Sequence, residues 1–402
     1  MDAGNRCSNQ EWLDSTYEKL LLKMKAECER IGTNIPYSTE KDGKYRDICE
    51  TTWGKRATAG GVGFWTNGFW PGMLWQMYEA TGDEAYKTTA VGVEERLDAV
   101  LENSEAVDHD VGFLFLPSSV ANYRKTGDAD ARRRGLLAAS LLASRYNLDG
   151  KFIRAWNGGK NSPLTEMFGG GDVRGWMIID CMMNIPLLYW ASEELDDPRY
   201  AKIAINHAKT AQKYIVRPDG SCNHIVAFDP DSGEFLTDLG GQGYQKGSSW
   251  SRGQSWAVYG FALSYHHTGD QSFLDTAKRC ANYCIANMAV NDWLPLVDYR
   301  QPAEVEKYDS TAAMCTACGL LEIASHVEEN EARFYTEAAC RILRACDDKF
   351  VDWDPEADSI VGGGTFFYHD PSGENTEVPI IYGDYFFIEA ILRLKGKALF
   401  TW

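Results

Sequence analysis

The 402-residue sequence contains no apolar run of about 18 residues, the length that a membrane-spanning helix needs. Its opening residues, MDAGNRCSNQEWLDSTYEKLLLKMKAE, are polar and then amphipathic, and they lack the apolar centre of a secretory signal. We therefore expect no membrane partner and a cytoplasmic protein, or a periplasmic one if an export signal has been removed.

Positive charge is also scarce. Forty Lys and Arg residues stand against 58 Asp and Glu residues, which gives a formal net charge of −18. Nucleic acids and anionic membrane surfaces bind basic faces, so this balance argues against both as partners. An anionic substrate would need local cationic side chains to offset the overall field.

Several common catalytic motifs are missing. The sequence has no Walker loop and no nucleophile elbow, and GGGTFFY at 362–368 follows no βαβ pattern. Its eleven cysteines are an odd number in a long chain, which favours reduced thiols. Cys280 and Cys284, like Cys315 and Cys318, fall at helical steps within apolar helices, which predicts buried thiols rather than zinc ligands. We expect no metal and no organic cofactor.

One phrase recurs along the chain: YEATGD from Tyr78, YRKTGD from Tyr123 and YHHTGD from Tyr265. Its Gly suits the left-handed position that ends a helix, and its Asp suits the N-cap of the next helix. The phrase therefore predicts a loose array of helix–turn–helix units. Segments with apolar residues at three- and four-residue steps predict helices at 71–81, 131–147, 199–215, 253–268, 272–288 and 332–350.

Strand-like alternation is scarce apart from short pieces such as GTFFYH. Five or six helical hairpins that must bury their faces against one another favour a closed ring. We predict an all-α fold, an (α/α)6 barrel or six-hairpin toroid, with functional residues in the Gly-rich loops at one end. A single catalytic domain would span 1–402, with residues 1–45 as an N-terminal helical segment packed on the barrel.

The apolar run RGWMIIDCMMNIPLLYW, residues 174–190, places Asp180 and Asn184 among core residues. An ionised carboxylate is costly to desolvate, so burial should raise the pKa of Asp180. Two interpretations follow from the residues alone. Asp180 is either a proton-transfer group or one half of a buried structural pair with Asn184.

Two further segments carry candidate residues. VDHDVGFLF at 107–115 contains Asp110, which is either a functional carboxylate or the cap of a helix. GFWTNGFWPGMLW at 63–75 contains Trp65 and Trp70, which form either one wall of a sugar site or part of the core.

The segment GGQGYQKGSSWSRGQSW, 240–256, leads through glycines to Ser251 as a predicted N-cap, with Arg252 in the first helical turn. A helix N-terminus and a guanidinium group both suit a carboxylate ligand. Alternatively, Arg252 pairs with a neighbouring acid.

Together these segments resemble the unsaturated glucuronyl hydrolases, glycoside hydrolase family 88. The resemblance covers roughly residues 50 to 395 and is carried by WTNGFWPGMLWQMYEATGD, HDVGF, GWMIIDCMMNIPLLYW, the 240–256 segment and IIYGDYFFIEAILR. It implies a six-hairpin α/α barrel. It also implies a substrate that is an oligosaccharide with a 4,5-unsaturated uronic acid at its non-reducing end, attacked by protonation at C4 and hydration at C5.

The resemblance also implies roles for individual residues. Asp180 matches the acid/base residue of the family, and Asp110 matches a second essential aspartate. Arg252 would lie near the uronate carboxylate. The positions that would contact substrate are Trp65, His224, Gln242, Trp250, Arg252, Trp256 and Tyr368.

Two departures from the family pattern bear on specificity. The segment 157–175 is longer than usual, which predicts a reshaped aglycone side. Residues 365–377 contain no Lys or Arg, although family members that accept sulfated fragments resemble one another in having Ser and Lys there. Asp370, Glu374 and Glu377 stand in this region instead and should repel sulfate, which favours unsulfated substrates.

Three rival functions remain open. An unsaturated rhamnogalacturonyl hydrolase would share fold and chemistry but act on pectin fragments. A sugar epimerase would need paired catalytic histidines, and of the seven histidines only His224 lies near the candidate segments. A non-catalytic glycan-binding barrel would not need both Asp110 and Asp180. For the oligomeric state we expect a monomer or a weak homo-oligomer.

Overall fold

A computed structural model describes residues 10–51, 61–103, 107–370 and 372–402. Residues 1–9 of the expected N-terminal segment lie outside these ranges. The α-helices are α1 (Gln10–Ile31), α2 (Phe69–Thr81), α3 (Glu84–Glu102), α4 (Val111–Phe115), α5 (Ala121–Thr126), α6 (Ala129–Ala143), α7 (Pro163–Phe168), α8 (Pro186–Leu195), α9 (Pro198–Tyr214), α10 (Ser251–Thr268), α11 (Gln271–Ala289), α12 (Ser310–Ser325), α13 (Glu329–Phe350) and α14 (Ile381–Leu394). Shorter helical turns are η2 (Ile48–Glu50), η5 (Trp65–Gly68), the π-turn η7 (Leu116–Val120), η8 (Val173–Gly175) and η9 (Ile179–Met183).

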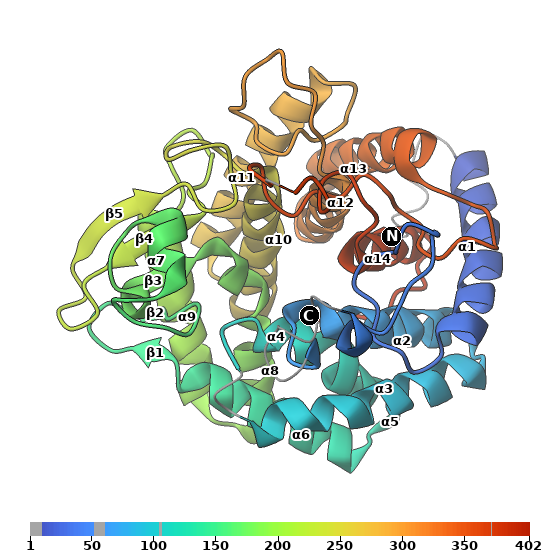
Figure 1. Ribbon diagram of the computed structural model, residues 1–402, viewed down its shortest axis with the longest axis horizontal. Coiled ribbons are helices and arrows are strands. Elements are labelled where there is room, and N and C mark those ends of the chain that lie inside the picture. The colour runs from blue at the N-terminus through green and yellow to red at the C-terminus, as the bar shows by residue number, and fades with distance from the viewer. Residues whose placement is uncertain (1–9, 52–60, 104–106, 371) are drawn as a thin grey trace.

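The helices form two concentric layers around one axis (Figure 1). The inner layer consists of α2, the α4–η7–α5 run, α8, α10, α12 and α14, and it closes where α14 contacts α2. The outer partners are α3, α6, α9, α11 and α13, and α1 covers α14. Helices α10, α12 and α14 are buried on nearly all sides, whereas α9 and α13 bury a single stripe, as inner and outer helices should. The predicted (α/α)6 barrel is confirmed.

The recurring Tyr-x-x-Thr-Gly-Asp phrase makes the joints between inner and outer helices. Gly82, Gly127 and Gly269 occupy the left-handed C-cap positions of α2, α5 and α10, with φ of 72°, 74° and 66°. The aspartate after each glycine caps the next helix by accepting a backbone N–H. The sequence prediction of these helix ends is therefore confirmed.

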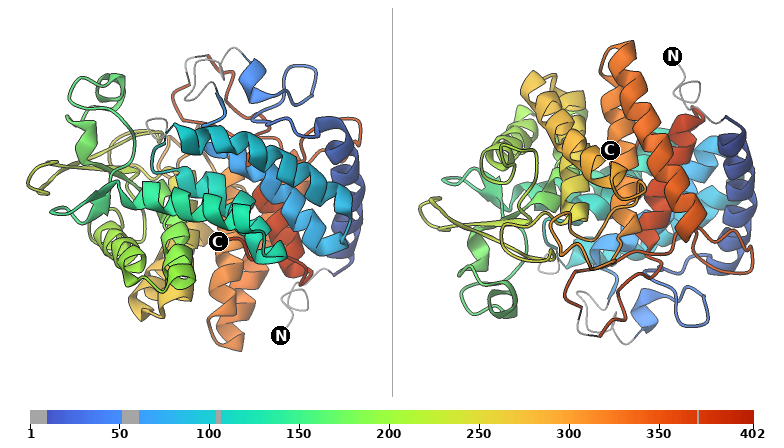
Figure 2. Two further views of the ribbon diagram at one scale, coloured as in Figure 1. Left: turned by 90° about the horizontal axis from the view of Figure 1, so that it is seen from below. Right: turned by 90° about the horizontal axis from the view of Figure 1, so that it is seen from above.

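The sequence did not predict the small antiparallel sheet that extends to one side of the helical ring (Figure 2). It contains β3 (Trp176–Ile178), β4 (Ile225–Phe228) and β5 (Phe235–Leu239), and β1 (Tyr146–Asn147) pairs with β2 (Phe152–Ile153) nearby. These strands are short, and β3 and β4 are buried throughout, so they lack the alternation that marks a strand in sequence. GTFFYH, by contrast, makes only one isolated bridge, between Gly364 and Val378.

The structure also tests the predicted helix ends and the predicted state of the cysteines. Helix α10 begins at Ser251 with Trp250 as its N-cap, so the predicted cap was one residue late. Helix α6 ends at Ala143, earlier than the predicted 147. The ten cysteines within the described residues are free thiols, and those of α11 and α12 are buried as predicted. No helix in the described part of the chain is both long and apolar enough to cross a bilayer.

The backbones of η5 and α4 approach each other closely at Gly68. A Cβ atom at Gly68 would lie 2.1 Å from the carbonyl oxygen of Phe113 and 2.5 Å from that of Leu114. Backbone atoms cannot move aside as a flexible side chain can, so only glycine fits. This contact holds the Trp65 turn against the start of α4.

We predict that Gly68→Ala destabilises the protein by about 1–3 kcal/mol, because the added methyl group must separate η5 from α4. Thermal unfolding measures the effect. Gly159→Ala is the matched control, since a Cβ atom at Gly159 meets no atom within 4 Å. Equal melting temperatures for the two variants would contradict the close-contact explanation.

Candidate active site

A cavity of about 580 Å³ opens at the end of the barrel where α4 and α10 begin. Its walls combine carboxylates, aromatic rings and one guanidinium group, drawn from five separate stretches of the chain and from Asp180. The lining residues are Gly63, Phe64, Trp65, Asp108, Asp110, Trp156, Leu164, Met167, Phe168, Asp180, Gly241, Gln242, Trp250, Arg252, Phe366, Phe367 and His369.

Asn184 joins the two candidate aspartates. Its Nδ2 donates to Asp110 Oδ1 at 2.9 Å and to the backbone oxygen of Asp180 at 3.2 Å, and its Oδ1 accepts from Phe113 N at 2.8 Å. Asn184 therefore pairs with the side chain of Asp110, not with that of Asp180. Gly112 permits this contact, because a Cβ atom there would lie 2.5 Å from Asn184 Cα.

Asp110 occupies the N-cap position of α4, but its side chain makes no capping hydrogen bond. Burial, the neighbouring carboxylate of Asp108 and that of Asp180 raise the pKa of Asp110 well above its ordinary value. The hydrogen bond from Asn184 offsets these effects only in part. The raised pKa of Asp110 favours the neutral form of this carboxyl group.

Asp180 behaves in the opposite way. Burial acts to raise the pKa of Asp180, but the facing imidazole of His224, helped by Arg252, outweighs burial and lowers the pKa below its ordinary value. His224 Nε2 lies 3.5 Å from Asp180 Oδ2. The sequence prediction of a raised pKa at Asp180 is thus wrong for the free protein, because the sequence could not show that His224 faces this carboxylate.

The tautomer of His224 follows from its other nitrogen. Gln242 N donates to His224 Nδ1 at 2.9 Å, so Nδ1 carries the lone pair and the ring proton sits on Nε2, toward Asp180. Gly241 allows the loop to approach the ring: its φ is +57°, and a Cβ atom there would lie 2.0 Å from Nδ1. Glycine is required at Gly241 for both reasons.

Arg252 is fully buried and lines the cavity, yet its charge is already paired. Nη1 donates to Asp309 Oδ2 and to the backbone oxygen of Thr365, and Nη2 donates to the backbone oxygen of Phe366. The guanidinium carbon also lies 4.4 Å from the ring centre of Trp250. The alternative that Arg252 bridges to a neighbouring acid is therefore observed, and the same bonds hold it rigidly against the cavity.

The loop before α10 is held in place by Asp298. Its Oδ1 accepts from Ser249 N at 2.9 Å, and its Oδ2 accepts from Tyr244 N at 3.0 Å and from Ser248 Oγ at 2.6 Å. Buried carboxylate bonds of this kind are stronger than bonds between neutral groups. They fix the backbone that carries Gln242 and Trp250.

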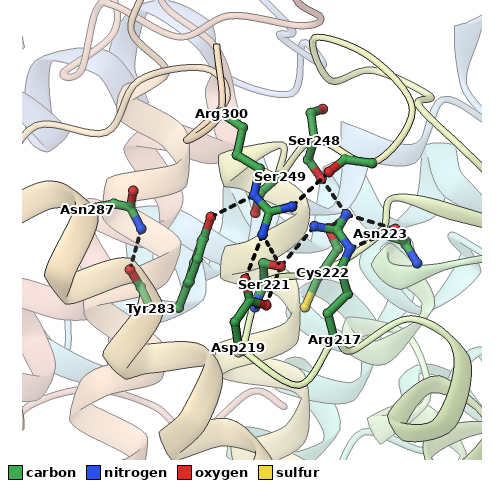
Figure 3. A network of polar contacts seen from close by, with 12 residues as sticks. Arg217, Asp219, Ser221, Cys222, Asn223, Ser248, Ser249, Tyr283, Asn287 and Arg300 are labelled. Atoms are coloured by element: carbon green, nitrogen blue, oxygen red, sulfur yellow. Dashed lines mark hydrogen bonds and ion pairs between the residues drawn. The ribbon is translucent and has the colours of Figure 1, made fainter. Parts of the chain in front are cut away.

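Two arginines support this loop from outside (Figure 3). Arg217 Nη1 donates to Ser221 Oγ and its Nη2 to the backbone oxygen of Ser248. Arg300 donates to the backbone oxygen of Gly247 at 2.9 Å and to Asp219 Oδ2 at 2.6 Å. The network joins the turn before β4, which leads to His224, to the loop that leads to Arg252.

Known proteins are similar to this chain in sequence and fold. The profile of Glycosyl Hydrolase Family 88 matches residues 37–267. The chain belongs to this family. It is similar to an unsaturated glucuronyl hydrolase of Bacillus sp. strain GL1, with 38% identity over 84% of this chain and 88% of the relative. It is also similar to an unsaturated chondroitin disaccharide hydrolase of Streptococcus pneumoniae, with 36% identity over 82% of this chain and 81% of the relative.

The fold of this family 88 glycoside hydrolase also matches solved structures. The crystal structure of the unsaturated glucuronyl hydrolase from Bacillus sp. GL1, described as responsible for the degradation of glycosaminoglycan, superposes with a TM-score of 0.86 at 34% identity. The match covers 97% of this chain and 98% of that one.

Most of the sequence-predicted site residues meet at the cavity. Asp110, Asp180, Trp65, Gln242, Trp250 and Arg252 line it, and His224 lies directly behind Asp180.

Two predicted residues lie behind the cavity wall of the hydrolase. Trp256 is fully buried against Phe113 and Phe386. The ring of Tyr368 packs on Tyr244, with their ring centres 5.0 Å apart.

Sequence reasoning missed part of the lining. Phe366, Phe367 and His369, which flank the predicted Tyr368, line the cavity, whereas Tyr368 is not among the lining residues. In an irregular loop, inward- and outward-facing side chains do not alternate with a fixed period. The tertiary structure is therefore needed to show which of these residues line the cavity. The sequence showed the length of the segment 157–175 but did not predict that Trp156, Leu164, Met167 and Phe168 line the cavity.

A possible metal-binding group lies outside the cavity of this hydrolase, at the other end of α10. Nitrogens of His266 and His326 and a carboxylate oxygen of Glu322 lie within 4.8 Å of one another. Glu322 is already satisfied, because both histidines contact its Oε1 at 2.9 and 2.8 Å and Arg393 pairs with its Oε2. The group is therefore explained by hydrogen bonding alone.

The opposed pKa shifts predict opposed effects on stability. The pKa of Asp110 is raised in the folded protein. Its contribution to the free energy of unfolding is therefore present at low pH and is lost as pH rises through that pKa. The folded pKa of Asp180 is lowered, so its contribution is present above the ordinary carboxyl pKa and is lost as pH falls through the folded value. Between about pH 3 and about pH 8, Asp110→Asn should gain stability relative to wild type as pH rises beyond about 4. Asp180→Asn should lose stability relative to wild type as pH rises from about 3 toward about 5 and should then keep a constant deficit.

Melting temperatures of the three proteins across this range test the assignment. Trends of the same sign in both variants would show that one of the two pKa directions is reversed.

Proposed function

We propose that this hydrolase removes 4,5-unsaturated glucuronic acid from the non-reducing end of glycosaminoglycan-type oligosaccharides. The observation that carries the proposal is the pairing of two aspartates in one cavity, joined through Asn184, with the pKa of Asp110 raised and that of Asp180 lowered. The named activities of the similar hydrolases from Bacillus and Streptococcus support the choice of substrate.

The chemistry requires a proton donor and a base on a sugar that holds a C4=C5 enol ether. A proton added to C4 leaves positive charge on C5 and the ring oxygen. Water then adds its oxygen to C5 and returns a proton to a carboxylate. The resulting hemiketal opens to a C5 ketone, and the hemiacetal left at C1 releases the aglycone as an alcohol. Protons and electron pairs balance with water as the only co-reactant.

Asp180 serves as the acid/base residue in this proposal. The substrate brings a further carboxylate into the cavity, beside Asp108, Asp110 and Asp180, and displaces water, and both changes raise the pKa of Asp180 toward the range that proton transfer needs. The raised pKa of Asp110 favours its neutral form, which can donate a hydrogen bond to the substrate without adding charge. His224 Nε2–H orients Asp180, as in other carboxylate–histidine pairs.

The remaining assignments concern binding. Trp65 and Trp250 offer aromatic surfaces to the sugar ring, and Gln242 and Arg252 lie where they can contact the uronate. Trp256 and Tyr368 act as supports of the wall rather than as contacts.

We propose further that the chain forms one catalytic domain. The ring is closed by elements from opposite ends of the sequence, since α1 covers α14 and α14 contacts α2. Removing either terminal helix would expose the buried face of its partner.

Hydrolysis is measured as the loss of ultraviolet absorbance of the conjugated double bond. We expect unsaturated chondroitin and hyaluronan disaccharides to lose this absorbance, and Asp180→Asn to slow the loss by about 10²–10⁴-fold, since its amide cannot transfer the proton. Circular dichroism of the variant controls for folding.

Other outcomes would contradict this function. Loss of absorbance only on an unsaturated rhamnogalacturonan disaccharide would move the activity to pectin fragments. Undiminished activity in Asp180→Asn would remove Asp180 from its role.

The charge of the cavity favours unsulfated substrates. Asp108, Asp110 and Asp180 line it, and the guanidinium of Arg252 is already paired with Asp309. Glu374 is exposed in the segment 365–377, which has no Lys or Arg and which supplies Phe366, Phe367 and His369 to the cavity lining. Among the described residues that line the cavity, a sulfate group would meet net negative charge and a single guanidinium that is already paired.

We predict that a 6-sulfated chondroitin disaccharide has a kcat/KM about tenfold or more below that of its unsulfated counterpart, a penalty of about 1.4 kcal/mol that added salt reduces. Glu374→Lys should narrow the difference. Glu18→Lys, on the exposed face of the outer helix α1, is the matched control and should leave it unchanged. A sulfated substrate that is preferred by wild type would contradict the charge argument.

A further inference from the structure

Helix α7 and the residue before its loop form an apolar wall of the cavity. Trp156, Leu164, Met167 and Phe168 line one side. Two of these side chains have an evident structural role. Leu164 and Phe168 pack on the small sheet's own hydrophobic cluster, which includes Trp176, and the ring of Phe168 lies 6.0 Å from that of Trp156.

Met167 has no such role. Its side chain is 67% exposed, it belongs to neither hydrophobic cluster, and it lines the cavity. A large apolar side chain held out to solvent at a binding cavity costs solvation energy in the free protein and regains it when a ligand covers the side chain. Its flexible thioether also adapts to ligands of irregular shape.

The wall is held in a fixed position. Leu164 N donates to Ser162 Oγ at 3.3 Å, and Thr165 Oγ1 donates to the backbone oxygen of Gly171 at 2.8 Å. Trp176 Nε1 donates to the backbone oxygen of Gly170 at 3.2 Å, which ties the exit of α7 to β3. These bonds place Met167 before any ligand arrives.

The cavity has a polar inner end and an apolar outer part. Asp110 is only 7% exposed, whereas Met167 and His369 are exposed. Phe366 and Phe367 also line the cavity, and their rings meet edge to face with centres 5.5 Å apart. A disaccharide with its uronate beside the aspartates therefore places its second sugar among apolar side chains.

We propose that α7 forms the aglycone-binding surface, with Met167 as a specificity-determining contact for an uncharged sugar that presents a methyl group. Such a methyl group belongs either to an N-acetyl substituent or to a 6-deoxy carbon. The inference rests on the proposed function, because it takes the uronate to lie beside Asp110 and Asp180. It gives α7, in the segment ahead of Asp180, a role in substrate binding.

The test compares Met167→Ser with wild type on four unsaturated glucuronyl substrates. Three are disaccharides whose second sugar is N-acetylglucosamine, rhamnose or glucose, and the fourth is the methyl glycoside, which lacks a second sugar. We expect KM to rise about threefold to fourfold on the N-acetylglucosamine or rhamnose substrate, the effect of one methyl group, with little change in kcat. The sugar that shows the rise identifies the source of the methyl group.

The control substrates and variant should not respond. The methyl glycoside should have the same kcat/KM in both proteins, and the glucose substrate should change least. Leu236→Ser alters another exposed apolar side chain, 57% exposed on β5 and outside the cavity lining, and should change none of the values. An equal effect of Met167→Ser on all four substrates, or no effect on any, would overturn the assignment.

A binding measurement separates this inference from the proposed reaction. Calorimetric titration of Asp180→Asn with each disaccharide, with and without Met167→Ser, does not depend on turnover. Weaker binding of one methyl-bearing disaccharide in the double variant supports the role of α7 even if wild type hydrolyses none of the substrates. Equal binding with and without Met167→Ser overturns that role even if hydrolysis proceeds.

Discussion

The site depends on one buried amide. Asn184 donates to the carboxyl group of Asp110 and to the backbone of Asp180, and it accepts the N–H of Phe113 at the start of α4. These bonds join two segments that are more than 70 residues apart in the chain, as the separation of Asn184 from Asp110 shows. Because every polar atom of the amide is engaged and no solvent reaches it, the two aspartates are held relative to each other without a flexible side chain between them. Gly112 is small for the same reason.

Different surroundings then divide the two carboxyl groups. Asp110 lies among other carboxylates, the amide of Asn184 and the ring of His109, whose Nε2 is 3.4 Å from Asp110 Oδ2, and its pKa is raised. Asp180 faces His224, and the imidazoles of His224 and His109 together with Arg252 lower its pKa. The tautomer of His224 is in turn decided by the backbone of Gln242, which the Asp298 anchor helps to position. Electrostatic asymmetry at the reacting centre is thus a consequence of hydrogen bonds made by a loop, and not of burial alone.

The barrel and its side extension have separate tasks. Within the described ranges, the ring has six inner and six outer helical positions. This arrangement brings the starts of α4 and α10 to one end of the barrel, where polar loops converge. The small sheet adds a second hydrophobic cluster beside the ring, and this cluster supports α7 at the cavity wall. The aspartates and the α7 wall therefore rest on different hydrophobic clusters.

The sequence by itself determined the ring. Helical periodicity and the Gly-Asp joints at Gly82, Gly127 and Gly269 are local signals, and local sterics and capping decide them wherever the helices end up. The motifs that resemble family 88 also identified Asp110, Asp180 and their neighbours. Only the tertiary structure decided the direction of the Asp180 pKa, the partner of Arg252, the inward face of 366–369 and the exposure of Met167. Each of these features depends on which groups from distant segments come within a few ångströms of one another. Neither sequence spacing nor composition predicts such distances.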